Sequence, residues 1–122
     1  MFKVHSYVRP NGDCPFDEYV DVVIRAGDKG GLARIQDMVE RLAELGSHGL
    51  TQQRWADKLN DVGELRWGAH RVLYFWDSID LTFVLLNWFR KKTPRTPAAE
   101  KHQAETLRAE YLARQKQRGG GS

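Results

Sequence analysis

The chain has 122 residues, and its 19 Lys+Arg outnumber its 16 Asp+Glu, which gives a formal net charge of +3. This length suits one compact domain rather than two with separate cores, and a composition of 41% hydrophobic and 29% charged residues excludes a disordered polymer. The chain has no apolar run near the roughly 20 residues that span a bilayer, no signal-peptide pattern and a single cysteine, Cys14, so we expect a cytoplasmic protein without an intrachain disulfide.

Hydrophobic periodicity predicts one domain over residues 1–118, followed by a flexible Gly-rich tail or linker over 119–122. In chain order the predicted elements are a strand at 2–8, helices at 16–26 and 28–45, an irregular segment at 47–60, strands at 63–67, 70–76 and 81–90, and a helix at 97–117. The later strands are apolar on both parities, which predicts helices on both sheet faces. This β-α-α-β-β-β-α order indicates a small α+β fold with a mainly antiparallel sheet.

The predicted turn at Gly68-Ala69 determines how two arginines face each other. Glycine in the first position fits a two-residue type II′ turn, which places Arg66 directly opposite Arg71. Two like charges about 5 Å apart destabilise a hairpin unless an anion such as phosphate lies between them. The alternative is that Glu64 or a helix carboxylate neutralises both arginines in a buried salt-bridge network.

The same pairing extends the prediction into the last strand. Continued across the next hairpin, it places Arg71 opposite Leu86. Trp88 and Arg90 then lie on the face that carries Arg66 and Arg71. Such a face could hold a phosphate and stack a nucleic-acid base.

Positive charge gathers in this part of the chain. Residues 66–95 include six basic and two acidic side chains and three of the four tryptophans. Clustered cations beside aromatics indicate a nucleic-acid surface, although a basic surface that only aids solubility would have the same composition. The six cations are Arg66, Arg71, Arg90, Lys91, Lys92 and Arg95.

Other chemistry is not indicated. The four histidines lack metal-ligand spacing and the chain has no Gly-rich phosphate loop, so we expect neither a metal nor another cofactor. His70 is the one histidine beside the arginines and the only one considered as a general base. Tyr111 is expected to pack in the core.

A series of motifs from Lys58 to Tyr111 resembles a known family. The motifs are, in order, Glu64-Leu65-Arg66, His70-Arg71-Val72-Leu73-Tyr74-Phe75-Trp76, Phe83-Val84-Leu85-Leu86 and Phe89-Arg90-Lys91-Lys92-Thr93-Pro94-Arg95-Thr96-Pro97, closed by a helix with Ala104 and Tyr111. On these residues the chain resembles the RelE/ParE toxin superfamily, and within it the HigB-like branch, which includes phage-derived host-killing proteins. The predicted order of elements agrees with this resemblance.

The resemblance implies the toxin of a type II toxin–antitoxin system. Such a toxin is a metal-free ribonuclease that cleaves mRNA in the ribosomal A site by attack of the ribose 2′-OH, and a cognate antitoxin, expected to be of helix-turn-helix type, restrains it. The alternatives are a ParE-like inhibitor of DNA gyrase and a nonenzymatic RNA-binding protein or inactive relative. The implied catalytic residues are Arg66, Arg71 and Lys91, and the implied RNA-binding residues are His70, Trp88, Arg90, Lys92 and Arg95.

Strand alternation and the resemblance disagree at the end of the last strand. Alternation places Arg90 and Lys92 on the face of the arginine pair, whereas the resemblance selects Lys91. A bulge near Phe89 would reconcile the two, so we keep all three cations as candidates.

Overall fold

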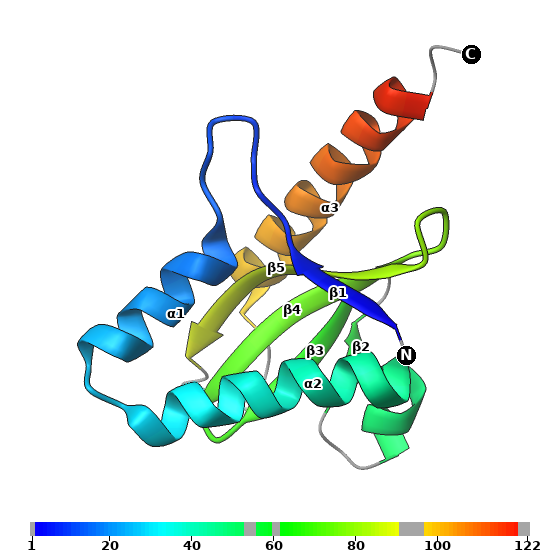
Figure 1. The fold of residues 1–122 in the computed structure, drawn as a ribbon. Helices are drawn as coiled ribbons and strands as arrows, with labels where there is room; N and C mark the ends of the chain where they lie inside the picture. The colour runs from blue at the N-terminus through cyan, green and yellow to red at the C-terminus, as the bar shows by residue number, and fades with distance from the viewer. Residues whose placement is uncertain (1, 53–55, 60–61, 91–96, 120–122) are drawn as a thin grey trace.

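The computed structural model describes residues 2–52, 56–59, 62–90 and 97–119 (Figure 1). These residues form β1 (Lys3–Ser6), α1 (Pro15–Arg25), α2 (Lys29–Gln52), β2 (Ala56–Leu59), β3 (Val62–Trp67), β4 (His70–Asp77), β5 (Thr82–Arg90) and α3 (Ala98–Gly119). The five strands are ordered β1-β5-β4-β3-β2, with β1 parallel to β5 and the other pairs antiparallel. The predicted α+β fold is confirmed, and β2 is an additional strand within the segment predicted to be irregular.

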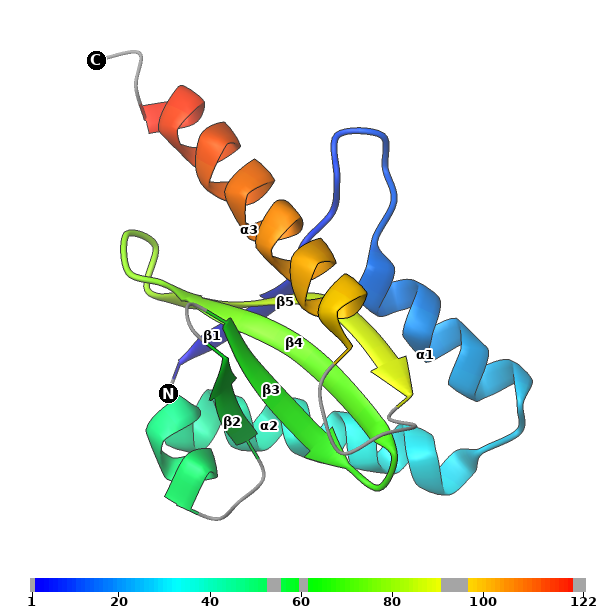
Figure 2. The same ribbon diagram turned by 180° about the vertical axis from the view of Figure 1, so that it is seen from behind.

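Helices cover both faces of the sheet, as the apolar strands predicted. Helices α1 and α2 lie on one face and α3 lies on the other (Figures 1 and 2). Each face has its own buried cluster because successive side chains of a strand point to opposite faces. Among the described residues, no helix is long and apolar enough to cross a membrane.

Glycine at position 46 shapes the end of the helical pair. Gly46 interrupts α2 with φ 70° and ψ 174°, so the predicted helix end corresponds to a break after which helical turns resume. A Cβ at this position would lie 2.9 Å from the ring of Phe2, whose backbone N–H donates to the carbonyl of Ala43. Only glycine meets both demands, the left-handed backbone and the close approach.

A buried carboxylate joins α3 to the end of the sheet. Asp77 is 1% exposed and accepts hydrogen bonds at Oδ2 from the Tyr111 hydroxyl (2.6 Å) and from Gln115 Nε2 (2.7 Å). Its Oδ1 accepts the backbone N–H groups of Ile79 and Asp80. Tyr111 therefore belongs to the core, as predicted.

A second carboxylate ties α3 to the segment after β1. Glu110 accepts hydrogen bonds from the Tyr7 hydroxyl (2.7 Å) and from the Arg9 guanidinium (3.1 Å). These two donors lower the pKa of Glu110 below its ordinary value. For Asp77, burial raises the pKa, but the hydrogen bonds from Tyr111 and Gln115 lower it more, so its pKa also lies below the ordinary value.

These lowered pKa values predict a loss of stability in acid. A carboxyl group whose folded-state pKa is depressed contributes stability above its unfolded pKa, near 4, and loses that contribution as pH falls through the lower folded value. We expect the urea midpoint to be constant from pH 7 to about pH 5 and to fall below pH 4. The Asp77→Asn variant should show a weaker dependence on pH, and an equal dependence in both proteins would contradict the assignment.

Candidate functional site

The β3–β4 hairpin places two arginines side by side. Gly68 has a φ of +54°, which the first position of a type II′ turn requires. The register pairs Trp67 with His70 and Arg66 with Arg71, as predicted. The hairpin therefore brings two guanidinium groups to the same face at one end of the sheet.

One carboxylate holds both of these arginines. Glu64, which lies two residues before Arg66 and on the same face of β3, is 2% exposed. Its Oε1 lies 3.2 Å from Nε of Arg66 and 3.3 Å from Nε of Arg71. The salt-bridge network considered as the alternative to an anion site is therefore present, with Glu64 as its centre.

Arg71 is the more tightly fixed of the two. Its side chain is 8% exposed, and its Nη1 donates to the carbonyls of Gly68 (2.6 Å) and His70 (2.8 Å). Burial lowers the pKa of the Arg71 guanidinium, while the neighbouring Glu64 raises it. A guanidinium stays protonated at neutral pH, so Arg71 is a fixed cation.

The site keeps a positive excess. One carboxylate neutralises one of the two guanidinium charges, so Glu64, Arg66 and Arg71 together carry a formal charge of +1. The side chain of Arg66 is 34% exposed, whereas that of Glu64 is 3% exposed. The charge that solvent or a ligand meets at this site is therefore that of an arginine.

The predicted register of the last strand is wrong. Arg71 pairs with Phe89 rather than with Leu86. Two of the three residues of difference arise at the β4–β5 turn, where Trp76 pairs with Phe83 rather than with Leu81, and the third arises from a register shift between Val72 and Tyr74. Leu86 and Asn87 together oppose the single residue Leu73, which is the geometry of a β-bulge.

The bulge also changes the sheet face on which the last side chains of β5 lie. One extra residue reverses the alternation of side chains, so Phe89 shares the face of Arg66 and Arg71. Trp88 and Arg90 lie on the opposite face, not beside the arginine pair as predicted. The single face expected to carry Arg66, Arg71, Trp88 and Arg90 is thus divided between the two sides of the sheet.

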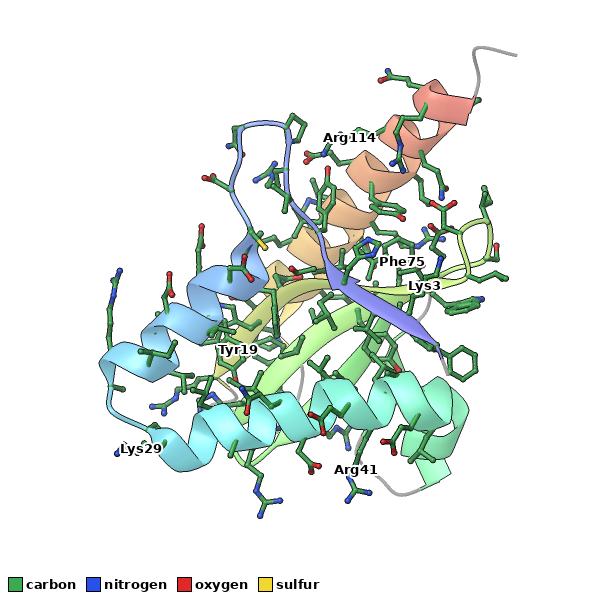
Figure 3. All side chains as sticks on the ribbon, viewed as in Figure 1. Lys3, Tyr19, Lys29, Arg41, Phe75 and Arg114 are labelled. Atoms are coloured by element: carbon green, nitrogen blue, oxygen red, sulfur yellow. The ribbon has the colours of Figure 1, made fainter. Side chains whose placement is uncertain are left out.

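Trp88 belongs to an aromatic group under α1. Its ring centroid lies 4.5 Å from that of Tyr19, which points from α1 toward the sheet (Figure 3), and the centroid of His70 lies 5.6 Å from Tyr19. His70 is 8% exposed, and burial together with Arg90 lowers its pKa, so the ring is neutral at pH 7. The candidate general base therefore packs on the face opposite the arginine pair.

Three of the predicted cations, Lys91, Lys92 and Arg95, lie outside the described residues. Their assignments remain predictions. With the bulge in the strand, the alternation of side chains no longer favours Arg90 and Lys92 over Lys91.

A cleft of about 630 Å³ lies along the end of β5. Asn87, 2% exposed, lines it and donates from Nδ2 to the carbonyl of Glu100 in α3 (3.1 Å). Asn87 was not among the sequence-predicted site residues, although a lone amide between apolar residues of a strand is a signal that could have found it. The other residues that line the cleft are Pro15, Glu18, Trp88, Phe89, Arg90, Pro97, Glu100 and Gln103.

The described residues contain no cluster of metal-binding side chains. No group of three or more His, Cys, Asp or Glu side chains that could hold a metal ion occurs among residues 2–52, 56–59, 62–90 and 97–119.

Comparison with protein families gives one match, which extends over residues 23–109 and therefore includes the whole arginine site. The matched family is described as "Phage derived protein Gp49-like (DUF891)". The chain belongs to this Gp49-like family. The membership confirms the phage-derived relationship predicted from the motifs, whereas the assignment to the HigB-like branch stays a prediction. No curated protein matches this Gp49-like chain.

Among solved structures, the Gp49-like chain is similar to a chain from the crystal structure of the toxin-antitoxin complex RelBE2 from Mycobacterium tuberculosis. The two share 17% sequence identity with a TM-score of 0.48, and the match covers 74% of this chain and 98% of that one. At this identity and TM-score, the two chains resemble each other only distantly in overall shape.

Proposed function

We propose that this Gp49-like protein is the toxin of a type II toxin–antitoxin pair and cleaves mRNA in the A site of the ribosome. The observation that carries the proposal is the arginine pair held by Glu64 with a positive excess. The phosphate of an RNA chain is the anion that two adjacent guanidinium groups suit best. The resemblance of the surrounding motifs to RelE-type toxins supports the ribosome as the place of action.

The proposed reaction needs a fixed cation more than it needs a metal. The ribose 2′-OH loses its proton as its oxygen attacks the adjacent phosphorus, the bond from phosphorus to the 5′-oxygen breaks, and the leaving 5′-oxygen takes up a proton, so the products are a 2′,3′-cyclic phosphate and a 5′-OH end. Negative charge builds up on the non-bridging oxygens of the pentacoordinate phosphorus. Arg71 is held by Glu64 and by two backbone carbonyls, so it would stabilise this charge without reorganising.

Arg66 and Lys91 complete the proposed site. The more exposed Arg66, whose side chain is 34% exposed, would orient the scissile phosphate. Lys91 would supply a further cation to the reacting phosphate, as the resemblance implies. Lys92 and Arg95 would contact RNA outside the reacting group, and the exposed Arg90 would do so from the other face of the sheet.

The structure changes the roles of three residues near the arginine pair. His70 packs against Tyr19 on the other face of β4, so we do not assign it as the base. Glu64 acts in this proposal as a positioning residue, because its Oε1 serves both arginines. Trp88, half-buried beside the cleft, is the residue we propose to stack a base, and it would do so on the face opposite the phosphate.

Partners and location follow from the same proposal. A toxin of this kind would harm its own cell, so we infer a cognate antitoxin, of helix-turn-helix type by the resemblance, and a cytoplasmic site of action with ribosomes and mRNA. No cofactor enters the proposed reaction.

Dependence on the ribosome is the test of this function. The modest net charge of +3 predicts weak, strongly salt-dependent binding to free RNA. Purified protein should therefore leave naked mRNA intact and cut the same mRNA when ribosomes present a codon in the A site, as primer extension would measure.

Three other outcomes would contradict the proposal. Efficient cleavage of naked mRNA would indicate a self-sufficient nuclease. Absence of cleavage in both reactions, together with inhibition of DNA gyrase in a supercoiling assay, would favour a ParE-like function. Absence of both activities would favour a nonenzymatic or inactive relative.

A further inference from the structure

The turn between β4 and β5 exposes two large apolar side chains. Ile79 is 74% exposed and Leu81 is 62% exposed, the two highest values among the large hydrophobic residues of the described chain. Leu81 also has a φ of +52°, and it is the only non-glycine residue with a positive φ in the described segments. A γ-branched residue in this conformation is strained, and such strain persists where the surroundings enforce it.

The rest of the turn shows what enforces this conformation. Asp77 Oδ1 accepts the N–H groups of Ile79 (2.9 Å) and Asp80 (3.2 Å), and Thr82 Oγ1 donates to the carbonyl of Asp80. Gln115 of α3 donates to Oδ2 of both Asp77 and Asp80. Hydrogen bonds to Asp77, from Thr82 and from Gln115 therefore fix the turn, while the side chains of Ile79 and Leu81 remain exposed to solvent.

A cationic cavity adjoins this turn. It has a volume of about 230 Å³ and is lined by residues of β1, of the segment that follows β1, and of α3, including His5, Tyr7, Tyr111, Arg114 and Arg118. None of its described lining residues is acidic, although Glu110 lies beside it and accepts a hydrogen bond from the Tyr7 hydroxyl, so the positive charge at the cavity is that of Arg118 and part of that of Arg114. Arg118 links the two features, because its Nη2 lies 4.0 Å from Oδ2 of Asp80 in the turn.

We propose that the β4–β5 turn and the adjoining cavity form a docking surface for an acidic, partly apolar segment of a protein partner. The inference rests on the proposed function, and the partner is then the antitoxin. Ile79 and Leu81 would enter an apolar pocket of that segment. Its carboxylates would enter the cavity beside Arg114 and Arg118, the type of residue that anchors protein interfaces.

The chemistry of the surface favours a protein over RNA. RNA bases stack on aromatic or guanidinium planes, whereas the two most exposed apolar residues here are aliphatic. Fixing the turn before binding also lowers the entropy that a partner must overcome. Burial of the two aliphatic side chains against a protein would then contribute a net binding free energy that RNA could not provide.

The position of this surface determines how the partner would inhibit. The β4–β5 turn lies at the opposite end of β4 from the β3–β4 turn (Figures 1 and 2). Six residues of strand separate Asp77 from Arg71, which corresponds to about 20 Å. A partner docked there would leave the arginine pair uncovered and would block entry to the ribosome by its bulk.

The test uses the full-length protein and the purified product of the gene adjacent to its own, with affinity measured by isothermal titration calorimetry. The double variant Ile79→Asn/Leu81→Asn should weaken binding by about 100-fold, and Asn tolerates the positive φ at position 81, so the fold is retained. Arg118→Glu should weaken binding by about tenfold. The matched controls are Val22→Asn/Ile24→Asn, which removes two exposed apolar residues of α1, and Arg34→Glu on α2; both should bind as wild type does.

Each remaining outcome decides the inference. Unchanged affinity of the turn variant, a loss of affinity in Arg71→Ala, or no binding of the adjacent gene product to the wild type would overturn it. Loss of binding to a fluorescein-labelled RNA in Arg118→Glu, with partner affinity unchanged, would assign the cavity to phosphate instead. If the wild type causes no growth arrest but the turn variant still loses the partner, the docking surface stands and the proposed function fails.

Discussion

Replacing Arg71 by alanine should lower ribosome-dependent mRNA cleavage by about 10²–10³-fold and abolish growth arrest. The expected size is that of removing one fixed group that stabilises charge in a transition state. The protein should remain folded, because Arg66 still pairs with Glu64 at 3.2 Å and the buried carboxylate keeps a partner. Cleavage rates and circular dichroism of the purified variant measure both parts of this prediction.

Two further variants test the role of Arg71 more closely. Arg71→Lys keeps the charge but cannot reach Glu64 and two carbonyls at once, so its activity should lie between those of wild type and alanine variant. Arg90→Ala removes a cation from the same end of the sheet but from its other face, and its loss should be at least tenfold smaller. Full toxicity of soluble Arg71→Ala, or equal losses in Arg71→Ala and Arg90→Ala, would contradict the assignment of the site.

Replacing Asp77 by alanine should lower the free energy of unfolding by about 3 kcal/mol. The substitution leaves the buried donors of Tyr111 and Gln115 and two backbone N–H groups without their common acceptor. For a domain of this size, we expect the melting temperature to fall by about 10 °C. Thermal denaturation followed by circular dichroism provides the measurement.

A neighbouring carboxylate serves as the control. Asp80 also accepts from Gln115, but its side chain is 52% exposed, so Asp80→Ala should cost less than about 1 kcal/mol. Similar losses in the two variants would show that burial of the Asp77 network does not determine the stability of this end of the sheet.

Most of the fold follows from local patterns in the sequence. Glycine at position 68 predicted a two-residue turn, which determined the pairing of Arg66 with Arg71 and therefore the register of the central hairpin. The spacing of apolar residues predicted all three helices. Strand β2 (Ala56–Leu59) was missed because it has four residues and no clear alternation.

The arrangement around the arginine pair was predicted only where local geometry determines it. Arg66, Arg71 and the alternative that Glu64 neutralises them were all present in the sequence reasoning. Trp88 was assigned to the wrong face, because a single extra residue in a strand leaves no mark on hydrophobic periodicity yet reverses every side chain after it. The packing of Asn87 and Tyr19 depends on contacts between distant segments, which periodicity does not contain.

The most direct test of the central claim is to map mRNA ends at nucleotide resolution in cells that express this protein. We expect new 5′-OH ends within coding regions, in phase with codons, that disappear when translation is blocked and are absent from cells that express Arg71→Ala. Growth arrest by the wild type without such ends, or the same ends in the presence of Arg71→Ala, would contradict the assignment of the arginine pair as a ribonuclease site.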